Sequence, residues 1–132
     1  FAPFEKWVWQ VPSHFNIGVA CTDIHLGTPT ESAIAMIVED DTLGTSEITF
    51  AGLSKRTSQF AQLLRNIGID AGDRVLIRLP NSLDYPTAFL GAMKRGAISV
   101  PTSTLLTADE VVEALVDAYR KKEAILKIIN QI

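Results

Sequence analysis

The clearest folding pattern in the chain lies in residues 72–103, GDRVLIRLPNSLDYPTAFLGAMKRGAISVPTS. Residues 74–79 are a short run rich in Val, Ile and Leu, which is typical of a strand buried on both faces. Pro86 suits the first turn of a helix, and Gly96, after two basic residues, suits its end. Residues 98–100 read as a second strand. The order strand, helix, strand predicts a right-handed parallel βαβ unit.

The flanking segments add a hairpin and helices to this unit. Residues 33–38 and 47–50 are strand candidates joined by a turn-rich connection, which predicts a β-hairpin. Residues 51–66 carry an amphipathic stripe and are predicted to form a helix. Thr107 and Glu110 have the spacing of a capping box, which opens another helix.

The two ends of the sequence are less regular. Residues 13–26 are predicted to form a short helix capped by Ser13. Residues 121–132 would continue the helical stripe of the segment before them, which Lys122 interrupts, and no Gly or turn residue separates a helix from a following strand. We therefore predict helix there. Trp7 and Trp9 are expected to anchor the start of the chain by packing, with ligand stacking as the alternative.

Length, charge and cysteine content narrow the class of protein. The 132 residues fit one domain, and a net charge of −3 argues against a nucleic-acid or anionic-membrane partner. The longest apolar run, residues 33–38, is too short to cross a bilayer, and no secretory leader is recognisable. Cys21 is the only cysteine, which excludes an internal disulfide and favours a cytoplasmic location.

Several stretches are similar to one enzyme superfamily. Residues 92–103, AMKRGAISVPTS, resemble the second core motif of the adenylate-forming (AMP-binding) enzymes, which include acyl-CoA synthetases, luciferases and peptide synthetases. Residues 47–75 resemble the stretch that holds the first core motif and its following helix. Residues 103–110 look most like the benzoate and medium-chain acyl-CoA ligase branch. The order and spacing of these motifs over residues 15–112 carry the resemblance.

The resemblance implies an α/β fold with a parallel βαβ core, a β-hairpin and flanking helices. This would be an incomplete part of the N-terminal domain of an adenylate-forming enzyme, and in that family a strand belongs near residues 124–129. Within a single domain, the expected segments are an aromatic segment with a short helix, a hairpin, a helix with the βαβ unit, and a C-terminal helical segment (1–32, 33–50, 51–106 and 107–132). ATP, Mg²⁺ and CoA are implied for the full-length enzymes.

The phosphate chemistry of the family has no visible counterpart in this chain. The family cradles ATP phosphates with a Ser/Thr/Gly-rich loop ending in Pro-Lys, and no such loop occurs here. Gly91 and Gly96 have P-loop spacing, but Ala97 and Ile98 stand where Lys and Ser/Thr are required. We therefore predict no catalytic residue, no metal ligand and no cofactor bound by this chain alone, which is expected to be inactive by itself.

Thr102, Ser103 and Thr104 are the candidate ligand-binding residues. They follow the carboxyl end of a parallel strand, where α/β sheets place ligands. The resemblance implies that the matching loop lies near the acyl-CoA tunnel. The alternative is a polar connection without a ligand. Asn81 and Ser82, after the other strand, carry the same two interpretations.

The remaining polar candidates are weaker. His14 and His25 with Asp23 could be metal ligands or an acid–base pair, but Asp23 and His25 are two residues apart and do not share a helix face. A structural role is favoured for them, although Asn16, Asp23 and His25 resemble the Asn…Asp-x-His pattern of many acyl-CoA synthetases. Cys21 has no identifiable base beside it and is expected to be inert.

Three functions remain open. The favoured one is the N-terminal segment of an AMP-forming acyl-CoA ligase acting on an aromatic or medium-chain acid. The second is a non-catalytic binding or oligomerisation module derived from that family, and the third is a small nucleotide binder. Open strand edges and apolar termini predict a partner, either another copy of the chain or the remainder of the enzyme.

Overall fold

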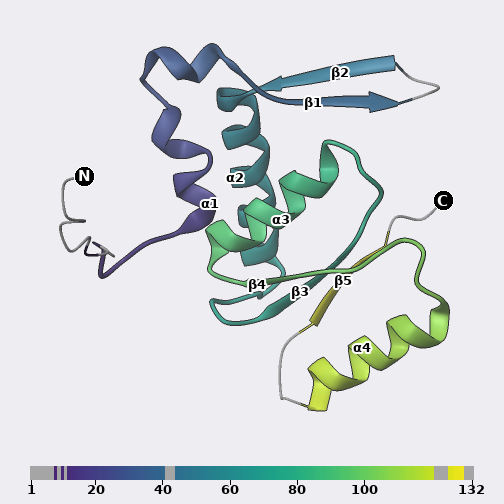
Figure 1. The fold of residues 1–132 in the computed structure, drawn as a ribbon. Helices are drawn as coiled ribbons and strands as arrows, with labels where there is room; N and C mark the ends of the chain where they lie inside the picture. Colours follow the sequence, from purple (N-terminus) through teal and green to yellow (C-terminus); the bar gives the residue numbers. More distant parts are fainter. Residues whose placement is uncertain (1–7, 9, 11, 41–43, 121–124, 130–132) are drawn as a thin grey trace, which may run out of the picture.

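The computed structural model describes residues 8, 10, 12–40, 44–120 and 125–129, so Trp7 and Trp9 fall outside the described residues. A three-stranded parallel sheet lies at its centre (Figure 1). Strand β3 (Arg74–Arg78) is the middle strand, with β4 (Ile98–Pro101) on one side and β5 (Ile125–Ile129) on the other. Both neighbours run parallel to β3.

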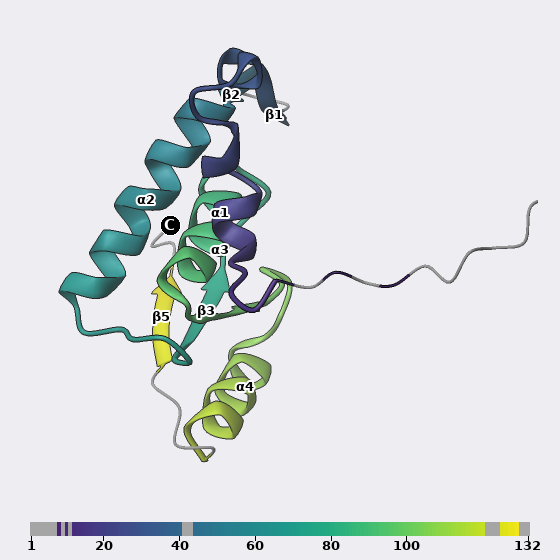
Figure 2. The same cartoon turned by 90° about the vertical axis from the view of Figure 1, so that its left-hand side faces the viewer.

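Helices cover the two faces of this sheet. Helix α3 (Asp84–Arg95) joins β3 to β4, and α4 (Ala108–Arg120) lies between β4 and β5 in the chain. Helices α2 (Phe50–Asn66) and α3 lie on one side of the sheet and α4 on the other (Figures 1 and 2). The predicted α/β class and the parallel βαβ unit are confirmed.

Local signals explain where these helices begin and end. Gly96 ends α3 in the left-handed conformation, with φ of 83°, which an L side chain rarely adopts. Thr107 and Glu110 form the predicted capping box, because the Thr107 N–H and hydroxyl both donate to the Glu110 carboxylate, at 2.7 and 2.9 Å. The same backbone and hydroxyl hydrogen bonds hold the pKa of Glu110 below its usual value.

The predicted hairpin is present as a separate two-stranded sheet. Strand β1 (Ile34–Asp40) pairs antiparallel with β2 (Gly44–Thr49). Thr49 then caps α2, because its side chain accepts a hydrogen bond from the Gly52 N–H at 3.2 Å. The hairpin therefore leads directly into the longest described helix.

The core lies between the sheet and the α2–α3 pair. In β3, Val75, Leu76 and Ile77 are at most 3% exposed, which explains the continuous apolar run in the sequence. Val75 and Ile77 belong to one buried cluster, whose other members are Leu64, Ile69, Ala88, Ala92 and Ala97. Leu76 alternates to the opposite face, where α4 lies.

The helix predicted for residues 121–132 is wrong at Ile125–Ile129, which form β5. Strand β5 runs parallel to β3 from Arg74↔Ile125 to Arg78↔Ile129, as the family pattern implied. The second edge of β3 offers backbone N–H and C=O groups that need partners, and a segment rich in Ile fits that ladder. Long-range pairing thus overrides the local helical pattern.

The N-terminal region also differs from the sequence prediction. Helix α1 covers only Ile17–Ala20, and Asn16 rather than Ser13 caps it, accepting from the Val19 N–H at 3.1 Å. Two short 3₁₀ helices follow, η1 (Asp23–His25) and η2 (Pro29–Ser32). The Asn16 amide donates to the Met93 carbonyl oxygen at 2.8 Å, so a tertiary contact determines where α1 begins. None of the described helices has the length and apolarity needed to cross a membrane.

Helices α2 and α3 approach each other closely at Gly91. A Cβ atom at this position would lie 2.8 Å from the Thr57 carbonyl oxygen and 2.9 Å from the Phe60 ring. The backbone oxygen cannot move aside without shifting α2. Gly91 is therefore a packing requirement of the helix pair and not part of a phosphate loop.

Replacing Gly91 by Ala tests this packing. Alanine would favour a helix by about 1 kcal/mol, but overpacking costs about 1–3 kcal/mol. Because the nearest atom is a backbone oxygen, the upper end of this cost applies, and we expect Gly91→Ala to lower the free energy of unfolding by about 2 kcal/mol in urea titrations. The exposed control Gln59→Ala on α2 should change it by less than about 0.5 kcal/mol. A Gly91→Ala protein as stable as the wild type would contradict the close approach.

Candidate functional site

A cleft of about 540 Å³ opens at the carboxyl edge of the parallel sheet. Two segments line it: the one after β3, with Tyr85 of α3, and the one after β4. The lining residues are Leu79, Pro80, Asn81, Tyr85, Pro101, Thr102, Ser103, Thr104 and Leu105. The structure thus brings the predicted residues Thr102–Thr104 and Asn81 to one cleft, whereas Ser82 lines a neighbouring pocket.

The wall after β4 is fixed mainly through backbone groups. The N–H and the hydroxyl of Thr102 both donate to the Ile77 carbonyl oxygen, at 2.8 and 3.0 Å. The Ser103 hydroxyl oxygen accepts from the Leu105 N–H at 3.1 Å. Ser103 and Thr104 are exposed, whereas Thr102 is half-buried. Thr102 therefore ties the loop to β3, and the next two residues present the polar surface of the wall.

The wall after β3 combines an amide with an aromatic ring. The Tyr85 ring stacks on Phe89 with 6.2 Å between centroids and an interplanar angle of 10°. Asn81 and Tyr85 also line a second pocket of about 350 Å³, against Met36, Ile37 and Val38 of β1. These two residues therefore stand between a more polar cavity and a more apolar one.

Arg78 connects the two walls, and the sequence analysis missed it. Its Nη2 atom donates to the carbonyl oxygens of Thr104 and Leu106, at 3.0 and 3.1 Å. Its Nε atom is buried and has no acceptor among the residues that the structure describes. Leaving a buried donor unpaired costs about 1–3 kcal/mol, and more for a charged group. A charged residue at the end of a buried apolar strand was the available signal.

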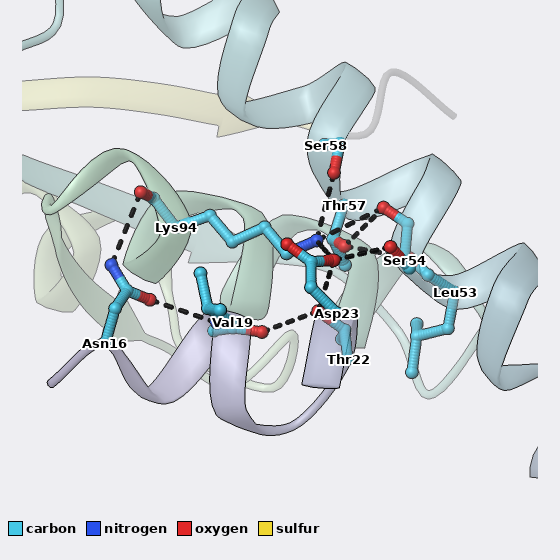
Figure 3. Close-up of polar contacts among 10 residues, drawn as sticks. Asn16, Val19, Thr22, Asp23, Leu53, Ser54, Thr57, Ser58 and Lys94 are labelled. Atoms are coloured by element: carbon cyan, nitrogen blue, oxygen red, sulfur yellow. Dashed lines mark hydrogen bonds and ion pairs between the residues drawn. The ribbon is translucent and has the colours of Figure 1, made fainter. Parts of the chain in front are cut away.

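A second polar cluster lies away from the cleft, where α1, η1, α2 and α3 meet (Figure 3). The Lys94 side chain is only 5% exposed, and its Nζ atom lies 2.5 Å from Asp23 Oδ1. It also donates to the Ser58 hydroxyl at 3.0 Å and to the Ser54 carbonyl oxygen at 3.2 Å. An ammonium group has three N–H donors, so each has an acceptor. The Ser54 hydroxyl donates to the same carboxylate oxygen at 2.5 Å.

These contacts determine the ionisation of Asp23. Burial by itself would raise the pKa of this carboxyl. The hydrogen bonds from Lys94 and Ser54, the attraction of the Lys94 charge and the nearby Thr22 hydroxyl together outweigh burial and lower the pKa below 3.8. Asp23 is therefore a structural anion bound to a cation and not a general base that takes up protons near neutral pH.

The histidines do not join this cluster. His25 packs on the Phe50 ring, with centroids 4.2 Å apart, and the His14 Nδ1 atom lies 3.2 Å from the Ser13 hydroxyl. Among the described residues, no three His, Cys, Asp or Glu side chains come together as a metal site would require. Cys21 is a free, exposed thiol. The Asn16 and Asp23 part of the family-like pattern has a physical explanation, because Asn16 binds the Met93 carbonyl and Asp23 binds Lys94 at the end of α3.

The parallel sheet, the helices on both faces and the separate hairpin define an α/β domain. A family model described as AMP-binding enzyme matches residues 26–121. The chain belongs to this family.

Similar proteins agree with this assignment. The acetyl-coenzyme A synthetase of Herminiimonas arsenicoxydans is 32% identical over 117 residues, which are 89% of this chain and 17% of that protein. The Brucella canis acyl-CoA synthetase shares the fold, with a TM-score of 0.71 at 22% identity over 88% of this chain and 24% of its own. A benzoate CoA ligase from Burkholderia xenovorans reaches a TM-score of 0.65 at 28% identity, over 80% and 20% of the two chains. The chain thus spans less than a quarter of these relatives.

The ion pair between Lys94 and Asp23 should contribute strongly to stability. Because Lys94 is buried, Asp23→Asn leaves the Lys94 charge without a counter-ion, and we expect the free energy of unfolding to fall by about 2–3 kcal/mol. Lys94→Met should destabilise the fold less than Asp23→Asn does, because the Asp23 side chain is 32% exposed and stays partly solvated. In a double-mutant cycle, the two substitutions together should cost clearly less than the sum of the single ones. Additive costs would contradict the pairing.

The lowered pKa of Asp23 predicts a specific pH dependence. The folded state favours the ionised carboxylate, so its contribution is complete above the unfolded value of 3.8 and is lost as pH falls through the lower folded pKa. The difference in unfolding free energy between wild type and Asp23→Asn should therefore shrink as pH is lowered below about 4. Urea titrations from pH 7 to pH 2.5 measure it. A difference that stays constant over this range would refute the assignment.

Proposed function

We propose that this chain is the N-terminal segment of an ATP-dependent, AMP-forming acyl-CoA synthetase. In the full-length enzyme, a carboxylate attacks ATP to form acyl-AMP and release pyrophosphate, and the CoA thiolate then displaces AMP. The match of residues 26–121 to the AMP-binding enzymes carries the proposal. The similarity to an acetyl-coenzyme A synthetase supports it.

The described residues do not fit ATP by themselves. Phosphate transfer needs backbone N–H groups and a lysine aimed at the developing charge. Gly91 and Gly96 lie in helix packing and at a helix end, and the Lys94 ammonium is fully used by its cluster. We infer that residues 1–132 alone carry out neither step. In this proposal the full-length enzyme uses ATP and CoA as co-substrates, together with Mg²⁺.

The cleft is the part of the chain that we assign to ligand binding. Thr102, Ser103 and Thr104 would line the approach of the acyl-CoA side of the reaction. The assignment is supported by their position at the carboxyl ends of parallel strands, where α/β proteins bind ligands, and by the cleft of about 540 Å³. We further propose an aromatic or medium-chain acid as substrate, which the resemblance of residues 103–110 supports. The acetyl-coenzyme A synthetases among the relatives offer a smaller acid as the alternative.

One set of observations favours a second candidate, a non-catalytic oligomerisation or binding module. Strands β4 and β5 are the outer strands of the described sheet, and each leaves one edge unpaired by any described strand. Large apolar side chains are exposed nearby, including Ile98 at 44% and Leu105 at 91%. Self-association or the remainder of the enzyme would cover these groups.

Pyrophosphate release distinguishes the two candidates. The full-length protein that carries these residues should release pyrophosphate only when a carboxylic acid is added with ATP and Mg²⁺. The purified 132-residue chain should show no release above a blank without acid. Acid-dependent release by the short chain would contradict the inferred need for the rest of the enzyme. No release by the full-length protein with acetate, benzoate or octanoate, together with a defined oligomer in light scattering, would favour the module.

A further inference from the structure

Arg78 holds both walls of the cleft at once. It is the last residue of β3, so the chain leads directly from it into the wall formed by Leu79–Asn81. Its Nη2 atom donates to two backbone carbonyl oxygens of the opposite loop, those of Thr104 and Leu106. One guanidinium group therefore links the end of β3, where one wall of the cleft begins, to the loop after β4, which forms the other wall.

This link is short and directional. Two carbonyl oxygens share one nitrogen at 3.0 and 3.1 Å, and hydrogen bonds from a charged donor are stronger than neutral ones. The loop has few other ties to the sheet: Thr102 binds the Ile77 carbonyl oxygen, and the remaining contacts through Ser103 are local. Arg78 thus supplies a long-range hydrogen bond to the loop at Thr104, one of the residues that line the cleft.

The buried Nε atom gives an independent reason to look beyond packing. It has no acceptor in the described part of the chain, although a guanidinium readily forms several hydrogen bonds in a fixed geometry. A methionine or leucine of similar volume would fill the same space without an unpaired donor. The guanidinium group is therefore better explained by the carbonyl groups of Thr104 and Leu106 that it binds than by the space that the side chain fills.

We propose that Arg78 is a positioning residue that sets the width of the cleft and thereby the binding of the thiol substrate, CoA. This proposal rests on the proposed function. Arg78 acts through the Thr104 and Leu106 carbonyl groups and does not itself take part in bond making or breaking. Its loss should loosen the Thr104–Leu106 segment and widen the cleft. In this proposal the effect falls on CoA binding and leaves adenylate formation largely unchanged, because Arg78 contacts only backbone carbonyl groups of the loop.

Arg74 offers a matched control. It lies four residues earlier on β3 and on the same face of the sheet, and its Nη1 atom donates to the Gly72 carbonyl oxygen at 2.8 Å. It sits at the amino end of the strand, away from the cleft. Arg74→Met therefore makes the same change of charge and size at the other end of the same strand.

Two measurements on the full-length protein test the proposal. Hydrogen exchange of the peptide covering residues 102–106 should become about tenfold faster in Arg78→Met, as loss of a charge-assisted hydrogen bond predicts, and stay unchanged in Arg74→Met. The KM for CoA should rise about tenfold in Arg78→Met, while acid-dependent ATP–pyrophosphate exchange stays within about twofold. Arg78→Lys keeps a cation beside the carbonyl oxygens and should restore part of the affinity for CoA.

The possible results separate this proposal from the proposed function. A wild-type KM for CoA in a folded Arg78→Met protein would overturn the proposal, and so would equal losses in Arg78→Met and Arg74→Met. If Arg78→Met does not fold, the same two measurements are made on Arg78→Lys. Unchanged hydrogen exchange of residues 102–106 and an unchanged KM for CoA in that variant would count against the positioning role. A wild-type protein that shows no ATP–pyrophosphate exchange would contradict the proposed function. Amide hydrogen exchange of residues 102–106 would still decide whether Arg78 holds the loop.

Discussion

The burial of β3 between two parallel neighbours is the constraint on which the structure depends. Val75, Leu76 and Ile77 are almost completely removed from water, so both faces of the sheet must be covered. Parallel strands cannot be joined by tight turns, and the required connections become α3 and α4. The same arrangement brings the carboxyl ends of β3 and β4 to one edge, where the following segments diverge and leave the cleft.

Much of this architecture could be predicted because its signals are local. The apolar run of β3, the glycine that ends α3 and the capping box of α4 each act within a few residues of their own position. Strand β5 could not be predicted in this way. Its segment has a helical stripe, and only the free edge of β3, about fifty residues away in the chain, turns it into a strand. The start of α1 was missed for the same reason, because Asn16 is held by the far end of α3.

In the candidate site, too, local features could be predicted from the sequence and long-range contacts could not. The positions of Thr102–Thr104 and of Asn81 at the sheet edge follow from topology alone, and the structure adds Tyr85 on the facing wall. Lys94 was read only as a favourable charge at a helix end, because its partner Asp23 is 71 positions away. Arg78 looked like an ordinary charged strand end, since the carbonyl groups it binds lie beyond an entire crossover helix. Cations with buried polar atoms therefore connect distant segments of this fold, and sequence patterns do not reveal their partners.

The parallel arrangement of β4, β3 and β5 is the central claim, since the cleft, the family fold and the role of Arg78 all follow from it. Nuclear Overhauser effects between backbone protons of isotope-labelled protein test it most directly. A parallel ladder in this register predicts amide-to-α-proton contacts that link Leu76 to its neighbours around Val100 and Lys127. Strong contacts between opposing α-protons of β3 and β4, which only antiparallel strands produce, would contradict it.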